Sequence, residues 1–306
     1  MPKIIKPKAI VILGATSTGK SDLAVHIAKN LLKNKAEIIS ADSRQVYKGL
    51  DLGSGKITKA EMQNVSHHLL DVVNPKKTFT VTQFKNLADQ KIEEIITRGN
   101  VPIIAGGTGF YIDSVVNNTV FPEVPPNAKL RKSLEGLSAD KLFLKLKKLD
   151  KVRAQNIKDK NELNNKVRII RAIEIAQALG VVPLAEVGLP QHEFIKVGLL
   201  LDESELKDKI EKRLLMRIKK GMLKEAKTLH DKGLSWKKMR ELGLEYRYMA
   251  LYLENKISKT EMIEELKNKI YQYAKRQKTW FKRDTEVKWF NPKEVNKIEK
   301  YIKENL

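Results

Sequence analysis

Short apolar runs alternate with helical patterns over the first hundred residues of this 306-residue chain. Residues 9–13 are all apolar, which predicts a buried strand that ends in a glycine-rich loop. Residues 21–33 follow with Leu23, Ile27 and Leu31 on one face, as an amphipathic helix requires. A strand followed by a covering helix is typical of a parallel α/β sheet.

The same alternation continues further along the chain. Apolar runs predict strands at residues 37–41, 101–105 and 194–201, and a short edge strand at residues 287–290. Thr80 and Gln83 have the spacing of a capping box, which predicts a helix from there to about Thr97, closed by Gly99. These elements together predict an α/β core.

The residue pattern changes after Asn118, which indicates a boundary in the chain. Residues 121–126 include three prolines, and the lysine-rich stretch beyond them has a helical pattern to about Leu179. We therefore predict a core formed by residues 1–118 and 193–306, with helices at its C-terminal end. A helical insertion at residues 119–192 would interrupt it.

The charge of the chain points to a polyanionic partner. Lys and Arg total 59 against 37 acidic residues, a formal net charge of +22. Such a surplus favours nucleic acid, because each phosphate contact releases counterions. A lysine-rich composition without functional meaning remains the alternative.

Composition also excludes several classes of protein. There is no cysteine, so disulfides, thiolate metal sites and a cysteine nucleophile are excluded. No apolar run approaches the roughly 20 residues that span a bilayer. Residues 1–8 are basic and lack the apolar stretch of a signal peptide. We expect a cytoplasmic protein.

The loop after the first strand has the sequence of a phosphate-binding loop. It reads Gly14-Ala15-Thr16-Ser17-Thr18-Gly19-Lys20-Ser21, which fits G-x-x-x-x-G-K-[ST] between a strand and a helix. Its backbone N–H groups and Lys20 would hold phosphate oxygens, and the Ser21 hydroxyl would ligate Mg²⁺. The motif predicts a di- or triphosphate ligand without specifying which.

An ATP- or GTP-using enzyme, such as a small-molecule kinase, is the ordinary interpretation of this loop. Asp202 follows the apolar residues 199–201, where such enzymes place a Mg²⁺-binding carboxylate. A solvent-facing Asp at the end of a strand is the simpler interpretation of Asp202.

Two further segments carry candidate chemistry. Asp42 begins Asp-Ser-Arg-Gln-Val-Tyr at the carboxyl end of the second strand, the edge at which open α/β sheets bind ligands. Its carboxylate could bind Mg²⁺ or accept a proton, or it could cap a turn. His67 and His68 favour a structural or substrate-orienting role over a metal site, because adjacent side chains diverge and no further ligand spacing appears.

In these motifs the chain resembles the tRNA dimethylallyltransferases, also called isopentenyl-tRNA transferases. The resemblance covers most of the chain, in the segments 14–21, 42–56, 67–72, 106–111, 168–174, 213–221, 243–248 and 274–280. It implies a core like that of the P-loop NTPases. It also implies transfer of a dimethylallyl group from dimethylallyl pyrophosphate to the exocyclic N6 of the adenosine on the 3′ side of the anticodon.

The resemblance assigns roles at the reacting centre. Residues 14–21 would grip the pyrophosphate, with Mg²⁺ on Ser21. Lys20 and Arg213 would offset the charge that grows on the leaving group. Asp42 would act as general base toward the adenine amine, and Thr108 would lie near the entering base.

The resemblance also implies contacts with the tRNA anticodon stem-loop. The residues concerned are Asp42, Ser43, Arg44, Gln45, Thr108, Arg168, Arg171, Gly243, Tyr246, Arg247, Arg276 and Gln277. The adenine would leave its stack to reach the site. Trp280 and Phe281 are more typical of core anchors than of base-stacking platforms.

The chain departs from the family pattern at several positions. Glu245 stands where the family has glycine and Tyr248 where it has glutamine, Asn165 replaces an Asp, Lys209 replaces an Arg, and a proline expected soon after Lys56 is missing. None of these changes falls on the phosphate loop or on Asp42.

Two other functions remain open beside prenyl transfer. They are a P-loop kinase and a non-catalytic RNA-binding protein. Within the family, the lack of a Cys/His zinc module favours a bacterial-type enzyme, for which we expect a monomer.

Overall fold

The computed structural model describes residues 6–183 and 186–306 and divides the chain into two compact units. The larger unit comprises Met1–Asn118 and Leu189–Leu306, and the smaller one Thr119–Gly188. Residues 1–5, part of the basic N-terminal segment that lacks a signal-peptide pattern, and residues 184–185 of the predicted insertion lie outside the described residues.

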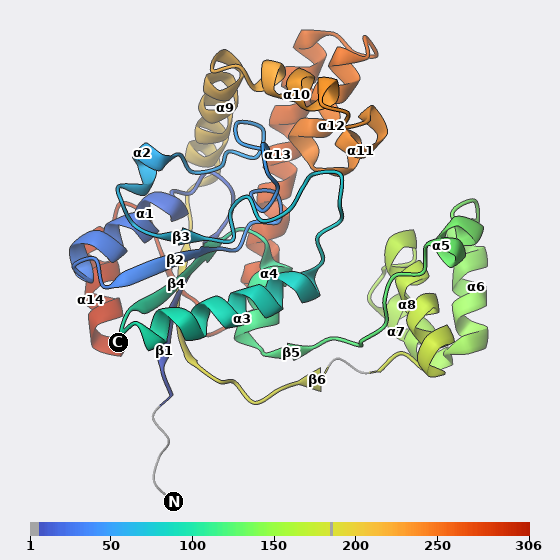
Figure 1. Ribbon diagram of the computed structural model, residues 1–306, viewed down its shortest axis with the longest axis horizontal. Helices are drawn as coiled ribbons and strands as arrows, with labels where there is room; N and C mark the ends of the chain where they lie inside the picture. Colours follow the sequence, from blue (N-terminus) through green and yellow to red (C-terminus); the bar gives the residue numbers. More distant parts are fainter. Residues whose placement is uncertain (1–5, 184–185) are drawn as a thin grey trace, which may run out of the picture. The chain divides into compact units, whose positions relative to one another are not determined.

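A six-stranded sheet forms the centre of the larger unit, and all of its neighbouring strands pair in parallel (Figure 1). In sheet order the strands are β3 (His67–His68), β2 (Ala36–Ser40), β4 (Val101–Gly106), β1 (Lys8–Gly14), β7 (Glu193–Leu199) and β8 (Lys288–Phe290). The predicted α/β core is therefore confirmed, and so is the predicted edge strand, which is β8. The histidine pair forms the other edge strand, which the pattern of apolar residues did not predict.

Alternate residues of β1 pack on opposite faces of the sheet, as the period of two in a strand requires. Ile10 and Ile12 belong to a core that includes α1 (Lys20–His26), its π-helical continuation η1 (Ile27–Leu31) and α14 (Val295–Asn305). Val11 and Leu13 belong to a core with α3 (Val81–Thr97) and α4 (Gly109–Val116). The capping box of Thr80 and Gln83 is present at the start of α3, so that helix is confirmed. Helices therefore cover both faces of the sheet, and the four inner strands β2, β4, β1 and β7 are mostly buried.

A layer of helices follows β7 in the chain and packs around the segment after β2. The helices are α9 (Glu203–Lys219), α10 (Met222–Asp231), α11 (Trp236–Glu241), α12 (Leu244–Leu253) and α13 (Lys259–Phe281). Val46 and Leu50 are buried among them, so this layer encloses the segment that follows β2. Helix α13 begins in the helical layer with Met262 and ends in the sheet core with Phe281. No helix in the described ranges is long and apolar enough to cross a membrane.

The smaller unit is a helical bundle with its own core. Its helices are α5 (Ala128–Leu134), α6 (Ala139–Leu149), α7 (Lys151–Asp159) and α8 (Lys166–Leu179), and a short antiparallel pair joins β5 (Thr119–Val120) to β6 (Glu186–Val187). Leu142, Leu146 and Ile169 are completely buried in this bundle. Asn165 caps α8 by accepting a hydrogen bond from the Arg168 N–H, so it does what an Asp would do there.

Candidate active site

The loop between β1 and α1 is closed tightly by glycine. Gly14 has φ of +149°, and a Cβ at this position would lie 2.6 Å from the carbonyl oxygen of Leu199 in β7. Gly19 precedes α1 with φ of +88°. Inside the loop, the Thr18 hydroxyl donates to the Ala15 carbonyl at 2.8 Å. The loop can therefore present its backbone N–H groups and a helix start to a phosphate group.

Lys20 is the cation of this loop. Its ammonium group donates to the Ala15 carbonyl at 2.6 Å. Burial and, after it, the positive charge of Arg213 lower the pKa of Lys20 to about 8, with the Asp42 carboxylate partly counteracting both. An anion bound beside Lys20 would favour its charged form.

Gln277 of α13 connects the phosphate loop to the loop after β4. Its Oε1 accepts from the Thr16 N–H at 2.8 Å, and its Nε2 donates to the Gly107 carbonyl at 2.7 Å. A Cβ on Gly107 would lie 2.4 Å from Nε2, so glycine is needed for this approach. We expected Gln277 to contact tRNA, but it is buried and its amide is bonded inside the protein on both sides.

Asp42 lies just after β2. Its Oδ1 accepts from the N–H groups of Arg44 at 2.8 Å and Gln45 at 3.4 Å, so the carboxylate caps a turn with one oxygen. The two interpretations of Asp42 are compatible, because a carboxylate has lone pairs to spare on its second oxygen. The Thr108 hydroxyl accepts from the Ser43 N–H at 3.0 Å and so connects the loops after β2 and β4.

Arg213 projects from α9 toward the segment that follows β2. Its Nη2 donates to the Gly55 carbonyl at 2.9 Å, and Gln45 Nε2 donates to the same oxygen at 3.3 Å. Burial and the neighbouring positive charge of Arg217 lower the pKa of Arg213, while carboxylates including those of Glu245 and Asp42 raise it. The site therefore concentrates positive charge and has room for an anion.

Two cavities meet at this point. The first, here the loop-side cavity, has a volume of about 460 Å³ and is strongly basic. Its cationic lining residues are Lys20, Lys56, Lys209, Lys212, Arg213, Arg217 and Lys220. The second, here the strand-end cavity, has about 320 Å³ and is lined by Asp42, Gly107, Tyr273 and Arg276 among others. Both cavities include Lys20, Ser21 and Arg213. Two ligands could therefore meet at a shared basic centre.

A magnesium ion fits the residues present only together with a phosphate ligand. No group of three His, Cys, Asp or Glu side chains in the described part of the chain could hold a metal. Ser21 is exposed and lines both cavities. Because Mg²⁺ commonly takes few protein ligands and completes its shell with water and phosphate oxygens, one hydroxyl at this place is compatible with it.

Eight of the residues expected to contact tRNA line the strand-end cavity. They are Asp42, Ser43, Arg44, Gln45, Gly243, Arg247, Arg276 and Gln277. Arg276 and Arg247 are exposed, and the Arg276 guanidinium lies 5.9 Å from the centre of the Tyr273 ring. Tyr273 is the aromatic residue of this cavity. It was missed because nothing in its sequence context separates it from a core position.

Tyr246, also expected to face RNA, lies elsewhere. It is 1% exposed, and its hydroxyl donates to Glu225 at 2.6 Å. A helical pattern cannot distinguish a buried tyrosine from an exposed one at the start of α12. Tyr246 has no surface to offer an RNA, and we correct that expectation. Phe281, expected to be a core anchor, is 2% exposed, and the indole of Trp280 donates to Asp113 at 2.8 Å.

Arg168 and Arg171 belong to the smaller unit, where both make internal contacts. Arg168 pairs with Glu162. Arg171 donates to the Val124 carbonyl at 2.7 Å and contacts Glu174 at 3.3 Å. Both side chains keep about a third of their surface exposed, at 39% and 33%, so each can still meet a phosphate.

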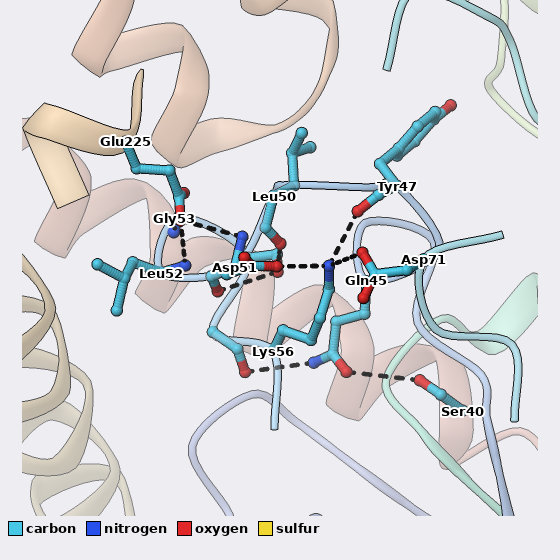
Figure 2. Close-up of polar contacts among 12 residues, drawn as sticks. Ser40, Gln45, Tyr47, Leu50, Asp51, Leu52, Gly53, Lys56, Asp71 and Glu225 are labelled. Atoms are coloured by element: carbon cyan, nitrogen blue, oxygen red, sulfur yellow. Dashed lines mark hydrogen bonds and ion pairs between the residues drawn. The ribbon is translucent and has the colours of Figure 1, made fainter. Parts of the chain in front are cut away.

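A polar network that sequence reasoning missed holds the segment after β2 in place (Figure 2). Lys56, with its side chain 6% exposed, donates to the Tyr47 carbonyl and to the carboxylates of Asp51 and Asp71. Glu225 accepts hydrogen bonds from three consecutive backbone N–H groups, those of Asp51, Leu52 and Gly53, at 3.1, 2.7 and 2.9 Å. No spacing in the sequence joins Glu225 to a segment 172–174 residues earlier.

The histidine pair lies outside both cavities. His68 contacts Glu37 at 2.7 Å, and Glu37 also accepts from Arg98 and Asn100. His67 Nδ1 lies 2.8 Å from the Val65 carbonyl oxygen. These contacts hold the edge strand β3 against β2.

The exposed carboxylate of Asp202 precedes α9 and makes no side-chain capping bond there. It is not among the residues that line either cavity.

Comparison with known proteins places these features in one family. A family model described as IPP transferase matches residues 45–284. The tRNA dimethylallyltransferase 2 of Treponema denticola is 43% identical over 283 residues, which is 91% of this chain and 92% of that protein. The tRNA dimethylallyltransferase of Acetivibrio thermocellus is 38% identical over 96% of this chain and 95% of its own.

Solved structures agree. The full-length tRNA isopentenylpyrophosphate transferase of Bacillus halodurans aligns with a TM-score of 0.73 at 33% identity, over 98% of this chain and 96% of that one. A eukaryotic dimethylallyltransferase acting on tRNA aligns with a TM-score of 0.80 at 24% identity, over 98% of this chain and 77% of that one, which bears on the fold alone. The resemblance inferred from the motifs is confirmed.

Proposed function

We propose, since this chain belongs to the IPP transferase family, that it transfers a dimethylallyl group from dimethylallyl pyrophosphate to a tRNA. The acceptor is the exocyclic N6 of the adenosine on the 3′ side of the anticodon. The observation that carries this proposal is the meeting of two cavities at Lys20, Ser21 and Arg213, with Asp42 on the wall of only the second. Two substrates can approach from different cavities and react where these meet.

The leaving group is the pyrophosphate of the donor. The phosphate loop, residues 14–21, binds it through backbone N–H groups, and Lys20 and Arg213 offset the charge that develops as the carbon–oxygen bond breaks. Mg²⁺ bound with Ser21 would neutralise further phosphate charge. Burial of both cations supports this role, because charge in a partly dehydrated site interacts more strongly than in water.

Asp42 is the general base. The adenine amine is a poor nucleophile, because its lone pair is delocalised into the ring. As the nitrogen–carbon bond forms, the amine proton passes to the Asp42 carboxylate and pyrophosphate departs. One Asp42 oxygen is fixed by the turn, which orients the carboxylate, and Thr108 holds the adjoining backbone at Ser43.

The target base must leave its stack to enter the strand-end cavity, at a cost of a few kcal/mol. Arg44, Arg247 and Arg276 at the cavity favour contact with the phosphates of the anticodon loop. Arg168 and Arg171 of the smaller unit would hold the stem, so residues 119–192 serve as the insertion that contacts tRNA. A tRNA substrate also supports action in the cytoplasm, and we propose that the chain acts as a monomer.

Incubation with Mg²⁺, labelled dimethylallyl pyrophosphate and unmodified tRNA tests the proposal, beside a parallel reaction with labelled ATP. Label is expected to enter tRNA from the prenyl donor only. Turnover of ATP without prenyl transfer would instead establish a P-loop kinase. Binding of tRNA that is indifferent to Lys20→Ala, with no turnover of either donor, would establish a non-catalytic RNA-binding protein.

A further inference from the structure

A second arginine, Arg217, lies one helical turn after Arg213 in α9, beside the proposed pyrophosphate site, and is buried. Its Nη1 donates to the carbonyl oxygens of Leu52 at 3.1 Å and Gly53 at 2.9 Å. Its Nη2 lies 3.2 Å from Oε1 of Glu245. Both terminal nitrogens of this guanidinium therefore bond to protein groups, and its buried Nε has no hydrogen-bond partner, although Arg217 borders the loop-side cavity.

The segment that Arg217 holds is residues 50–55, here the 50–55 loop. Glu225 accepts the N–H groups on one side of this loop, including those of Leu52 and Gly53 (Figure 2). Arg217 donates to the carbonyl groups of the same two residues. An anion and a cation therefore fix opposite polar groups of one short stretch of backbone.

The 50–55 loop contacts the Arg213 guanidinium through Gly55. A Cβ on Gly55 would lie 2.5 Å from Nη2 of Arg213 and 3.4 Å from Nη1 of Arg217, so the backbone passes close to both guanidinium groups. Gly55 has φ of +63°, a conformation that favours glycine. Its carbonyl accepts the hydrogen bond from Arg213. Displacement of the loop would consequently displace Arg213.

Arg213 and Arg217 carry the same charge and repel each other in a site with little access to water. Arg217 is 7% exposed, and burial together with its charge lowers the pKa of Arg213. Among the described residues, Glu245 is the carboxylate that pairs with Arg217. Removing one partner of a buried ion pair is costly, because the other charge remains without compensation. Glu245 therefore stabilises Arg217 where it is.

We propose that Glu245 is a positioning residue for the pyrophosphate. By pairing with Arg217, it keeps that guanidinium on the 50–55 loop, and the loop keeps Arg213 directed at the donor. This inference rests on the proposed function and assigns a role to a residue that the family resemblance did not account for. Glu245 lines the strand-end cavity, yet its effect is on the substrate in the other cavity.

Titration calorimetry of the full-length protein with inorganic pyrophosphate and Mg²⁺ tests the proposal without depending on catalysis. Glu245→Gln is expected to weaken pyrophosphate binding about tenfold, which is the order expected for loss of one charged hydrogen bond. Glu254→Gln is the matched control, since it breaks another Arg–Glu pair, with Arg240, that does not touch the 50–55 loop. This control is expected to bind pyrophosphate as the unaltered protein does.

Steady-state kinetics separate positioning from contact with RNA. Glu245→Gln is expected to raise KM for dimethylallyl pyrophosphate about tenfold and to leave KM for tRNA within about twofold. Adding Glu245→Gln to Arg217→Gln should have little further effect, because the two residues act through one pair. Glu245→Asp, which keeps the charge on a shorter arm, should have intermediate affinity and replaces the glutamine variant if that one does not fold.

Unchanged pyrophosphate affinity in Glu245→Gln would overturn the inference. A raised KM for tRNA with unaltered pyrophosphate binding would also overturn it, by showing that Glu245 contacts the acceptor. If the unaltered protein binds pyrophosphate but prenylates no tRNA, the proposed function fails. The calorimetric comparison of the two glutamine variants then still decides whether Glu245 positions the anion site.

Discussion

The Lys20 ammonium group donates its 2.6 Å hydrogen bond to the Ala15 carbonyl of its own loop. The cation is thus held at the centre of the phosphate loop by a neutral acceptor, in surroundings that lower its pKa to about 8 through burial and the charge of Arg213. A lysine in ordinary surroundings would be fully charged at physiological pH, whereas this one titrates close to it.

Pyrophosphate affinity should therefore fall as pH rises above about 8. Below that pH Lys20 is charged and attracts the anion. Above it, binding must take up a proton to restore the charge, so affinity falls by up to about tenfold per pH unit. Calorimetry at pH 9 in two buffers of different ionisation enthalpy should reveal this proton uptake. Lys20→Met should bind pyrophosphate weakly at every pH and should lose the part of the proton uptake that comes from Lys20. Equal proton uptake in the two proteins would contradict the assignment of this titration to Lys20.

Asp42→Asn should abolish most of the turnover while leaving donor binding almost intact. Asparagine keeps an oxygen to accept the N–H groups of Arg44 and Gln45, so the turn persists, but it cannot accept the amine proton. A lost general base reduces kcat by about a hundred- to ten-thousand-fold. Single-turnover transfer to tRNA measures this. Asp202→Asn removes an exposed carboxylate that follows another strand of the sheet, β7, and lines neither cavity, so it should leave the rate unchanged. Comparable rates for the two variants would refute Asp42 as base.

Gln277→Ala should destabilise the protein and weaken pyrophosphate binding together. The substitution leaves the Thr16 N–H and the Gly107 carbonyl without their buried partner, at about 1–3 kcal/mol for each unpaired group. Urea unfolding gives the free energy change and calorimetry the affinity. Gln277→Glu is the informative companion. It keeps the acceptor for Thr16 but places a carboxylate against the Gly107 oxygen, so it should be at least as destabilising. A stable Gln277→Ala with normal affinity would show that the bridge is dispensable.

The sequence predicted those parts of the fold and site that are local in the chain. Residues 14–21 are contiguous, and the spacing of their glycines and lysine is typical of one loop conformation. The sequence alone therefore predicted the phosphate loop. The helix from Thr80 and the edge strand at β8 follow from a capping box and an apolar run. In each case the information lies within one short segment.

The rest depends on contacts between segments far apart. Gln277 has the same helical context as its exposed neighbour Arg276, and only the close approach of Gly107 decides that it points inward. Tyr246 and Glu225 form a bond that no periodicity indicates. His67 and His68 form a strand through pairing with β2, because two residues are too few to establish a pattern. Tertiary packing decides such positions.

Binding of tRNA should depend steeply on salt, and Arg276 should account for part of that dependence. The chain carries a formal charge of +22, and Arg276 is exposed at the rim of the strand-end cavity. If it contacts one phosphate, Arg276→Gln should lower the slope of log affinity against log salt by about 0.7–0.9. Filter binding between about 50 and 200 mM salt measures the slope. Lys300→Gln removes the same charge from α14, where the side chain is 77% exposed, and should leave the slope unchanged. Equal slopes for Arg276→Gln and Lys300→Gln would mean that the charge acts diffusely and that Arg276 makes no phosphate contact.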